Sequence, residues 1–143
     1  MRFTCVSAAA LPAGIWTWPH IDPATEWADT RTGQLLAESD FLDLLERLRA
    51  AFGRPIPIVS GYRTPAHNVE VSATASSFGP HTLGLAADIA VHGPAAFELL
   101  QHALALGFTG IGVAQKGPVA SRYLHLDMAP NRPDAPRPLI WSY

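Results

Sequence analysis

The clearest periodic pattern in the chain lies between Ser39 and Gly53. Apolar residues recur there at intervals of three and four, which is the spacing of one face of a helix. They are Phe41, Leu44, Leu45, Leu48 and Phe52. Ser39 can cap the first turn, and Gly53 is suited to ending the last one. The pattern therefore predicts a helix over residues 40–52.

A second helix is predicted from Pro94 to Leu106. Proline is favoured in the first turn of a helix, and Gly107 follows the last apolar position. One face of this helix would carry Ala96, Leu99, Leu100, Ala103, Leu104 and Leu106. Two amphipathic helices of this kind need a sheet or another helix on which to bury their apolar faces.

Four short apolar segments predict strands, at residues 55–60, 85–91, 108–113 and 122–128. Side chains alternate between the two faces of a strand. In the last segment Tyr123, His125 and Asp127 therefore share one face, and the leucines between them point to the other. This strand presents an apolar face to a core and a polar face on which chemistry can take place.

The remaining segments show no regular pattern. Residues 1–37 are interrupted by prolines, so we expect an irregular N-terminal segment, and residues 64–80 are expected to form a surface loop or a broken helix. The Pro-rich tail, residues 129–143, ends in apolar residues that we expect to pack back on the protein. The length of 143 residues fits one domain.

Composition and charge exclude several classes of protein. Ten Lys and Arg residues against 12 Asp and Glu residues give a net charge of −2. A protein that binds nucleic acid usually has an excess of basic residues, so we expect no nucleic-acid partner. No segment approaches the ~18 consecutive apolar residues of a membrane helix, so we expect no membrane insertion. The single cysteine, Cys5, excludes an internal disulfide framework. The N-terminus has no clear signal peptide, and the oligomeric state is left open.

A candidate metal site follows from three polar residues. His81 precedes Asp88 by seven residues, with Gly84 between them, so a loop histidine can fold back towards a strand aspartate. His125 adds a second imidazole from the later strand. Such a set leaves the fourth position of a tetrahedral Zn²⁺ ion open for water. The His–Asp spacing alone is more typical of a buried pair that binds no metal.

Three segments together carry a resemblance to a known family. They are SGYRTPAHN at residues 60–68, GPHTLGLAADI at residues 79–89 and YLHLD at residues 123–127. In this order they resemble the zinc D-Ala-D-Ala carboxypeptidase family, whose carboxypeptidases, dipeptidases and phage endolysins cut peptidoglycan stem peptides. The small phage-associated members are the most similar, and the resemblance covers about residues 34–143. It implies an α+β fold with a small, mainly antiparallel sheet, helices packed on it and a zinc site in a groove on the sheet, as in the hedgehog signalling domain.

The resemblance also implies roles for individual residues. His81, Asp88 and His125 match the zinc ligands of the family. Arg63 matches the arginine that faces the scissile carbonyl in the family's dipeptidases. The alternative for Arg63 is a structural role in which it pairs with an acid beneath the long loop.

The sequence departs from the family pattern at two positions. Gly79 stands where the family often has Ser, two residues before the first ligand. Arg122 stands where better-known members have the Glu or Asp that activates the zinc-bound water. Asp127 shares a strand face with His125 and is the obvious substitute for this base. It can equally serve as a hydrogen-bond partner of a histidine ligand, and both roles stay open.

The function implied by the resemblance is zinc-dependent hydrolysis of amide bonds in peptidoglycan stem peptides. The protein would be an endolysin or a cell-wall-remodelling peptidase, made in the cytoplasm and acting on the cell wall. The alternative is a non-catalytic, zinc-containing module that binds peptidoglycan or forms part of a phage particle, because the usual acid is absent at Arg122. A metal-free structural protein is a third possibility. Which peptide bond would be cut is left open.

Overall fold

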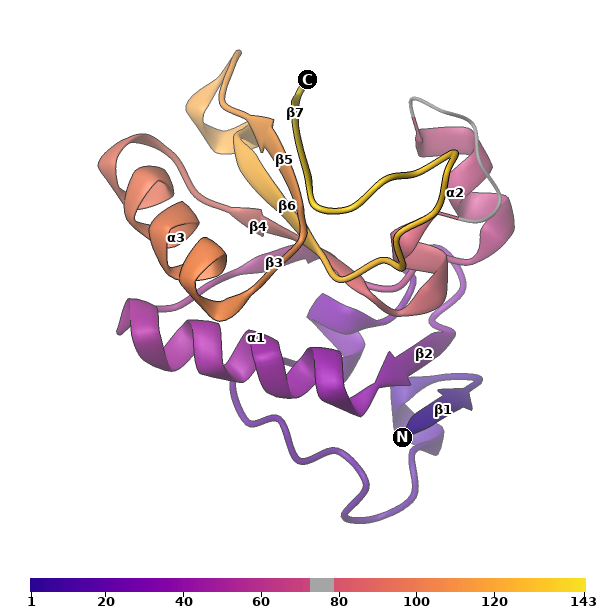
Figure 1. Cartoon of the computed structure of the whole chain (residues 1–143). Helices are drawn as coiled ribbons and strands as arrows, with labels where there is room; N and C mark the ends of the chain where they lie inside the picture. Colours follow the sequence, from indigo (N-terminus) through magenta and orange to yellow (C-terminus); the bar gives the residue numbers. More distant parts are fainter. Residues whose placement is uncertain (73–78) are drawn as a thin grey trace.

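Within residues 1–72 and 79–143, which the computed structural model describes, five strands form the main sheet in the order β3–β4–β6–β5–β7 (Figure 1). The strands are β3 (Ile58–Ser60), β4 (Ala86–Ala90), β5 (Gly110–Ala114), β6 (Tyr123–Asp127) and β7 (Leu139–Ser142). Neighbouring strands are antiparallel, except that β5 and β7 run parallel. The prediction of a mixed α+β fold with a mainly antiparallel sheet is confirmed.

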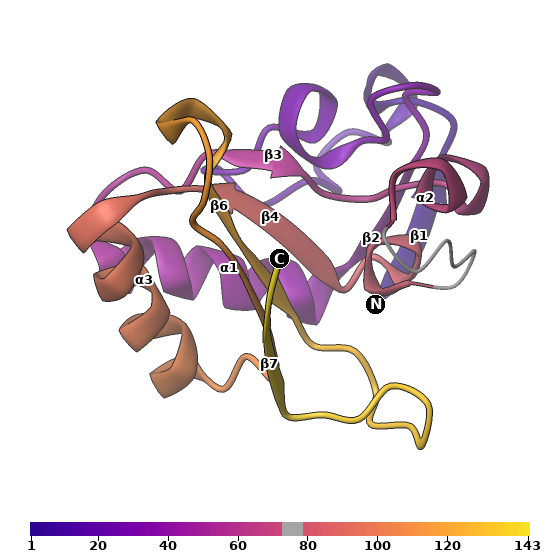
Figure 2. The ribbon, with the colours of Figure 1, turned by 90° about the horizontal axis from the view of Figure 1, so that it is seen from above.

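Two helices, α1 (Ser39–Phe52) and α3 (Gly93–Leu106), lie on one side of this sheet (Figures 1 and 2). Both match the predicted helices within one residue at each end. The buried residues of α1 are Phe41, Leu42, Leu45, Leu48 and Phe52. Leu42 is thus part of the core, and Leu44 is only partly buried. The helix is therefore rotated slightly from the orientation that the spacing of Phe41 and Leu44 indicated.

Strand β6 separates the core from the polar face of the sheet. Leu124 and Leu126 belong to the core between the sheet and the helices. The intervening His125 pairs in register with Asp88 of β4 on one side and with Gly112 of β5 on the other. Alternation along the strand therefore places His125 on the face opposite the helices.

The N-terminal segment differs from the expectation that residues 1–37 are irregular. Strand β1 (Arg2–Cys5) pairs antiparallel with β2 (Leu35–Glu38) as a second sheet. Short helical turns occupy Ala8–Ala10 and Pro23–Trp27, and the indole of Trp27 is completely buried. Local periodicity did not reveal strands β1 and β2 because each is only four residues long.

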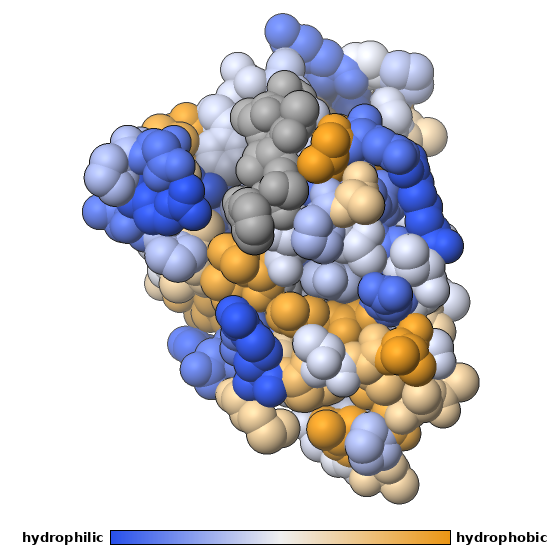
Figure 3. All heavy atoms as spheres, turned by 90° about the vertical axis from the view of Figure 1, so that its right-hand side faces the viewer, coloured by the Kyte–Doolittle hydropathy of each residue, from blue (hydrophilic) through white to orange (hydrophobic). Residues whose placement is uncertain are grey.

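On the side of the molecule seen in Figure 3, hydrophobic surface is concentrated in the lower half.

The segment between β3 and β4 contains α2 (Pro65–Val71) and a 3₁₀ turn at Pro80–Leu83. The predicted loop or broken helix at residues 64–80 includes residues 73–78, which lie outside the described residues. The Thr64 hydroxyl caps α2 by accepting the backbone N–H of His67. In the part of the chain that the structure describes, no helix is both long and apolar enough to cross a membrane.

Candidate metal centre

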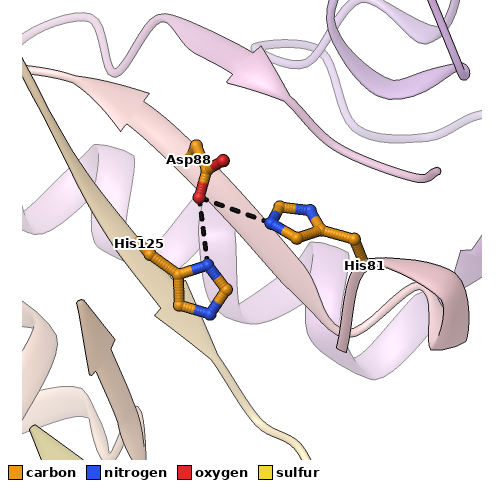
Figure 4. A group of neighbouring side chains, drawn as sticks. All are labelled: His81, Asp88 and His125. Atoms are coloured by element: carbon orange, nitrogen blue, oxygen red, sulfur yellow. Dashed lines mark hydrogen bonds and ion pairs between the residues drawn. The ribbon is translucent and has the colours of Figure 1, made fainter. Parts of the chain in front are cut away.

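Three side chains from separate elements meet on the polar face of the sheet (Figure 4). His81 comes from the 3₁₀ turn, Asp88 from the middle of β4 and His125 from the middle of β6. One ligand atom of each residue lies within 4.8 Å of the others. The structure therefore brings together the three residues that the sequence indicated as a metal site.

The distances within this cluster fit a tetrahedral metal ion. Nε2 of His81 lies 3.4 Å from Oδ1 of Asp88, and Nδ1 of His125 lies 3.0 Å from the same oxygen. Two ligand atoms that are each ~2.0–2.2 Å from a tetrahedral Zn²⁺ ion lie roughly 3.3 Å apart. Two imidazoles and one carboxylate are also a donor set that zinc prefers. The residues present therefore fit a zinc ion.

The outer nitrogen of each imidazole is held by the protein. Nδ1 of His81 lies 2.7 Å from the carbonyl oxygen of Gly61, and Nε2 of His125 lies 2.7 Å from Oδ2 of Asp127. When the outer nitrogen of each neutral ring carries the proton, it donates to these oxygens, and the lone pair of the inner nitrogen faces Asp88. Metal-bound histidines are usually oriented by a carbonyl or carboxylate in this way. A cation between the inner nitrogens and Asp88 would satisfy all three groups.

Burial and charge set the protonation of the cluster. The exposed fractions of His81, Asp88 and His125 are 4%, 6% and 5%. Burial lowers the pKa of His81, which favours the neutral imidazole. Burial would raise the pKa of Asp88, but its interactions with the imidazoles of His81 and His125 hold it below the ordinary value. Burial would lower the pKa of His125, but hydrogen bonds to Asp127 and Asp88 raise it. The carboxylates of Asp88 and Asp127 therefore favour a positive charge at His125.

Arg63 lies beside the cluster, just after β3. Its Nη2 donates to Oδ2 of Asp88 at 3.0 Å, the carboxylate oxygen that does not contact the histidines. Its Nε donates to Ser60 at 2.9 Å and its Nη1 to Asn68 at 3.2 Å. The backbone N–H of Arg63 donates to the carbonyl oxygen of His81. Arg63 therefore fixes the orientation of Asp88 from outside the cluster.

Asp127 is fully enclosed, with an exposed fraction of 0%. Its Oδ1 accepts from Nε of Arg137 at 2.8 Å and from the backbone N–H of Ala129 at 3.1 Å. Its Oδ2 accepts from Nη2 of Arg137 at 2.8 Å and from His125. Burial would raise the pKa of Asp127, but the hydrogen bonds from His125 and Arg137 hold it below the ordinary value. Both carboxylate oxygens are thus engaged.

The C-terminal segment forms one wall of the site, and the sequence did not identify its residues. The ring of Trp141 lies 5.2 Å from that of His125, between centroids, and the guanidinium carbon of Arg137 lies 5.4 Å from the Trp141 ring. A Cβ atom on Gly112 would lie 2.8 Å from Nε1 of Trp141. The only signal in the sequence was the apolar end of the tail, which did not show where it would pack.

The other histidine near the site has a separate partner. Nδ1 of His67 lies 2.8 Å from Oδ2 of Asp29, and the backbone N–H of His67 is bonded to Thr64. This pair ties α2 to the N-terminal segment. Within residues 1–72 and 79–143, no second group of three His, Cys, Asp or Glu side chains is close enough to share a metal ion.

The fold and the cluster together are typical of a metal-dependent hydrolase, with two histidines and an aspartate on the polar face of a small sheet. A family model described as Peptidase M15 matches residues 21–127, a range that includes all three residues of the cluster. The chain therefore belongs to the peptidase M15 family, whose members are metal-dependent peptidases that act on peptidoglycan. A search of curated proteins and a search of solved structures each found no match.

Proposed function

We propose that this protein hydrolyses amide bonds in peptidoglycan stem peptides, with a Zn²⁺ ion held by His81, Asp88 and His125. The observation that carries the proposal is the convergence of their ligand atoms within 4.8 Å. Membership of the peptidase M15 family supports the class of reaction. In the cell the enzyme would act on the cell wall, as an endolysin or a remodelling peptidase.

The zinc ion would polarise the scissile carbonyl and lower the pKa of a water molecule towards ~7. Arg63 would assist at the carbonyl. Three of its five N–H groups are used in the side-chain contacts found among the described residues. The guanidinium stays charged at all working pH values, so its other N–H groups can donate to an oxygen that becomes negative during the reaction.

For Asp127 we propose the role of a partner that orients His125. A general base needs a lone pair within hydrogen-bond reach of water, and both oxygens of Asp127 are already occupied by N–H donors. Asp127→Asn should then weaken zinc affinity by ~10–100-fold, with activity returning as zinc is added. A base role predicts unchanged zinc affinity and a roughly 10²–10⁴-fold loss of turnover.

One observation favours the alternative of a zinc-containing module without turnover. The usual acid is replaced by Arg122, whose Nε donates to the carbonyl oxygen of Gly117 at 3.1 Å. Among the described residues, the carboxylates that contact the two histidines are Asp88 and Asp127. A module of this kind would bind stem peptides and leave them intact.

Mass spectrometry of purified muropeptides after incubation with zinc-loaded protein tests the proposal. Cleavage should appear as fragments whose summed mass exceeds that of the substrate by one water molecule, and the fragments identify the bond that is cut. His125→Ala is the matched control and should give no fragments. Binding of stem peptides without any fragments would support the non-catalytic module. A wild-type protein that neither binds zinc nor cleaves muropeptides would contradict the proposal.

A further inference from the structure

The segment between β6 and β7 places Arg137 next to Asp127, on the side of His125 that faces away from Asp88. Arg137 lies ten residues after Asp127 and donates two hydrogen bonds of 2.8 Å to its carboxylate, one to each oxygen. This fork-to-fork arrangement is the strongest geometry available to an arginine and a carboxylate, and it fixes the plane of the carboxylate. The plane of Asp127 in turn determines where Oδ2 meets His125.

This ion pair is largely shielded from water. The exposed fractions of the Arg137 and Asp127 side chains are 9% and 0%. Gly110 of β5 leaves the space for the pair, since a Cβ atom there would lie 2.1 Å from Oδ1 of Asp127. A buried carboxylate that loses its partner is left uncompensated in a medium of low dielectric constant, so solvent screens the effect of removing Arg137 only weakly.

Arg137 also touches the other neighbour of His125. Its guanidinium carbon lies 5.4 Å from the centroid of Trp141, and the Trp141 ring lies 5.2 Å from the His125 ring. The imidazole of His125 is thus held at its outer nitrogen by Asp127 and flanked by Trp141. The guanidinium of Arg137 contacts both of these neighbours of His125.

We propose that Arg137 is a positioning residue of the metal centre, which orients the ligand His125 through Asp127. With Asp127 fixed, the outer nitrogen of His125 stays bonded and the inner nitrogen faces Asp88 at 3.0 Å. Without Arg137, the carboxylate can rotate and the imidazole loses this orientation. The inference rests on the metal site of the proposed function, and it adds the C-terminal segment to the parts that build that site.

Zinc affinity, measured by competition with a chromophoric chelator, tests this role without any activity assay. Arg137→Gln should weaken zinc binding by about 10–100-fold, the usual effect of removing a group that orients a ligand. Arg137→Lys keeps the charge but not the two-pronged geometry, so it should lose less. Arg132→Gln is the matched control, because Arg132 lies in the same segment and pairs with the exposed Asp134. It should bind zinc within about twofold of the wild type.

A double-mutant cycle separates positioning from simple anchoring of β7. If Arg137 acts through Asp127, adding Arg137→Gln to Asp127→Asn should cost less than about threefold in zinc affinity, because the interaction is already lost. An equal loss in both backgrounds would mean that Arg137 only anchors the strand, and the inference would be wrong. Zinc binding by Arg137→Gln within twofold of the wild type would also overturn it.

Circular dichroism and thermal unfolding check that each variant is folded. If Arg137→Gln does not fold, the comparison of Arg137→Lys with the wild type and in the Asp127→Asn background decides in the same way. A wild-type protein that binds no zinc would contradict the proposed function itself. Normal wild-type binding with unaffected Arg137 variants would contradict only the positioning role.

Discussion

Gly110 of β5 faces the side chain of Asp127 so closely that a methyl group at Gly110 would lie 2.1 Å from Oδ1 of Asp127. Carbon and oxygen atoms that are not bonded stay more than 3 Å apart, so one of the two residues would have to move. Asp127 has little freedom to do so, because Arg137, His125 and the backbone of Ala129 all hold it. The absence of a side chain at Gly110 is therefore a condition for the arrangement behind the metal site.

Gly110→Ala should lower the free energy of unfolding by ~1–3 kcal/mol, the usual effect of forcing an extra methyl group into a packed site. It should also weaken zinc binding, because the displaced carboxylate no longer orients His125. Urea unfolding and chelator competition measure the two effects. A variant with wild-type stability and zinc affinity would show that the carboxylate can move without consequence.

His81→Ala should abolish tight zinc binding, because it removes one of the three ligands from the cluster. The wild type should hold one zinc ion per chain, as measured by inductively coupled plasma mass spectrometry after gel filtration. Zinc at 100 times its dissociation constant should stabilise the wild type by about 2.7 kcal/mol and leave His81→Ala nearly unaffected. His102→Ala is the control, since His102 lies on α3 away from the cluster, and it should behave like the wild type.

Leu45→Ala should reduce the free energy of unfolding by ~2–5 kcal/mol, because Leu45 lies in the centre of the core with an exposed fraction of 0%. His102→Ala should change it by no more than about 0.5 kcal/mol, because that side chain is one-third exposed. The midpoints of urea unfolding compare the two. Equal losses would mean that the buried faces of α1 and α3 are assigned wrongly.

Asp29 gives a test that depends on pH. Its carboxylate is 2% exposed and accepts N–H groups from three backbone positions and a ring nitrogen. These donors belong to Arg31, Thr32, Thr64 and His67. Burial would raise the pKa of Asp29, but the backbone N–H of Thr64 and the hydrogen bond from His67 bring it well below the ordinary value.

An acid whose pKa is lowered by folding stabilises the protein above its unfolded pKa of about 3.9, and this contribution is lost as the pH falls below that value. Asp29→Asn should therefore be less stable than the wild type at pH 7. The difference should narrow below pH ~4, because the unfolded wild-type chain then takes up a proton on Asp29 that the folded protein does not bind. Urea unfolding at pH 7 and pH 3 measures both. A stability difference between Asp29→Asn and the wild type that stays constant with pH would contradict the lowered pKa of Asp29.

The parts of the fold that the sequence predicted are those with a strong local pattern. Both long helices follow from apolar spacing and from the glycines that end them; Gly53 has the left-handed φ of 72° that a side chain disfavours. The placement of Asp88 and His125 on strands follows from alternation together with the motifs, and the structure adds that these two strands pair. The strand predicted at residues 55–60 is shorter, at Ile58–Ser60, because proline at position 57 has no N–H for a sheet bond.

The parts that could not be predicted depend on contacts between distant segments. The pairing of β1 with β2 joins residues 30 to 36 positions apart, and neither strand has a distinctive pattern. Arg137 stands in a Pro-rich stretch where a charged residue is usually solvated, so nothing in its neighbourhood indicated Asp127 as its partner. Arg137 lies two residues before β7, and no local rule specifies the parallel pairing of β7 with β5.

The place of β7 at the edge of the sheet has a consequence for biosynthesis. Asp88 leaves the ribosome 37 residues before His125, and Arg137 follows Asp127 by ten more. A nascent chain that has exposed His81 and Asp88 therefore lacks the third ligand, His125. Arg137, the buried counter-ion of Asp127, takes its place only when β7 is available. Since chains begin to fold during synthesis, we expect high-affinity zinc uptake to be a late event, after residues 125–137 have emerged and β7 has paired with β5.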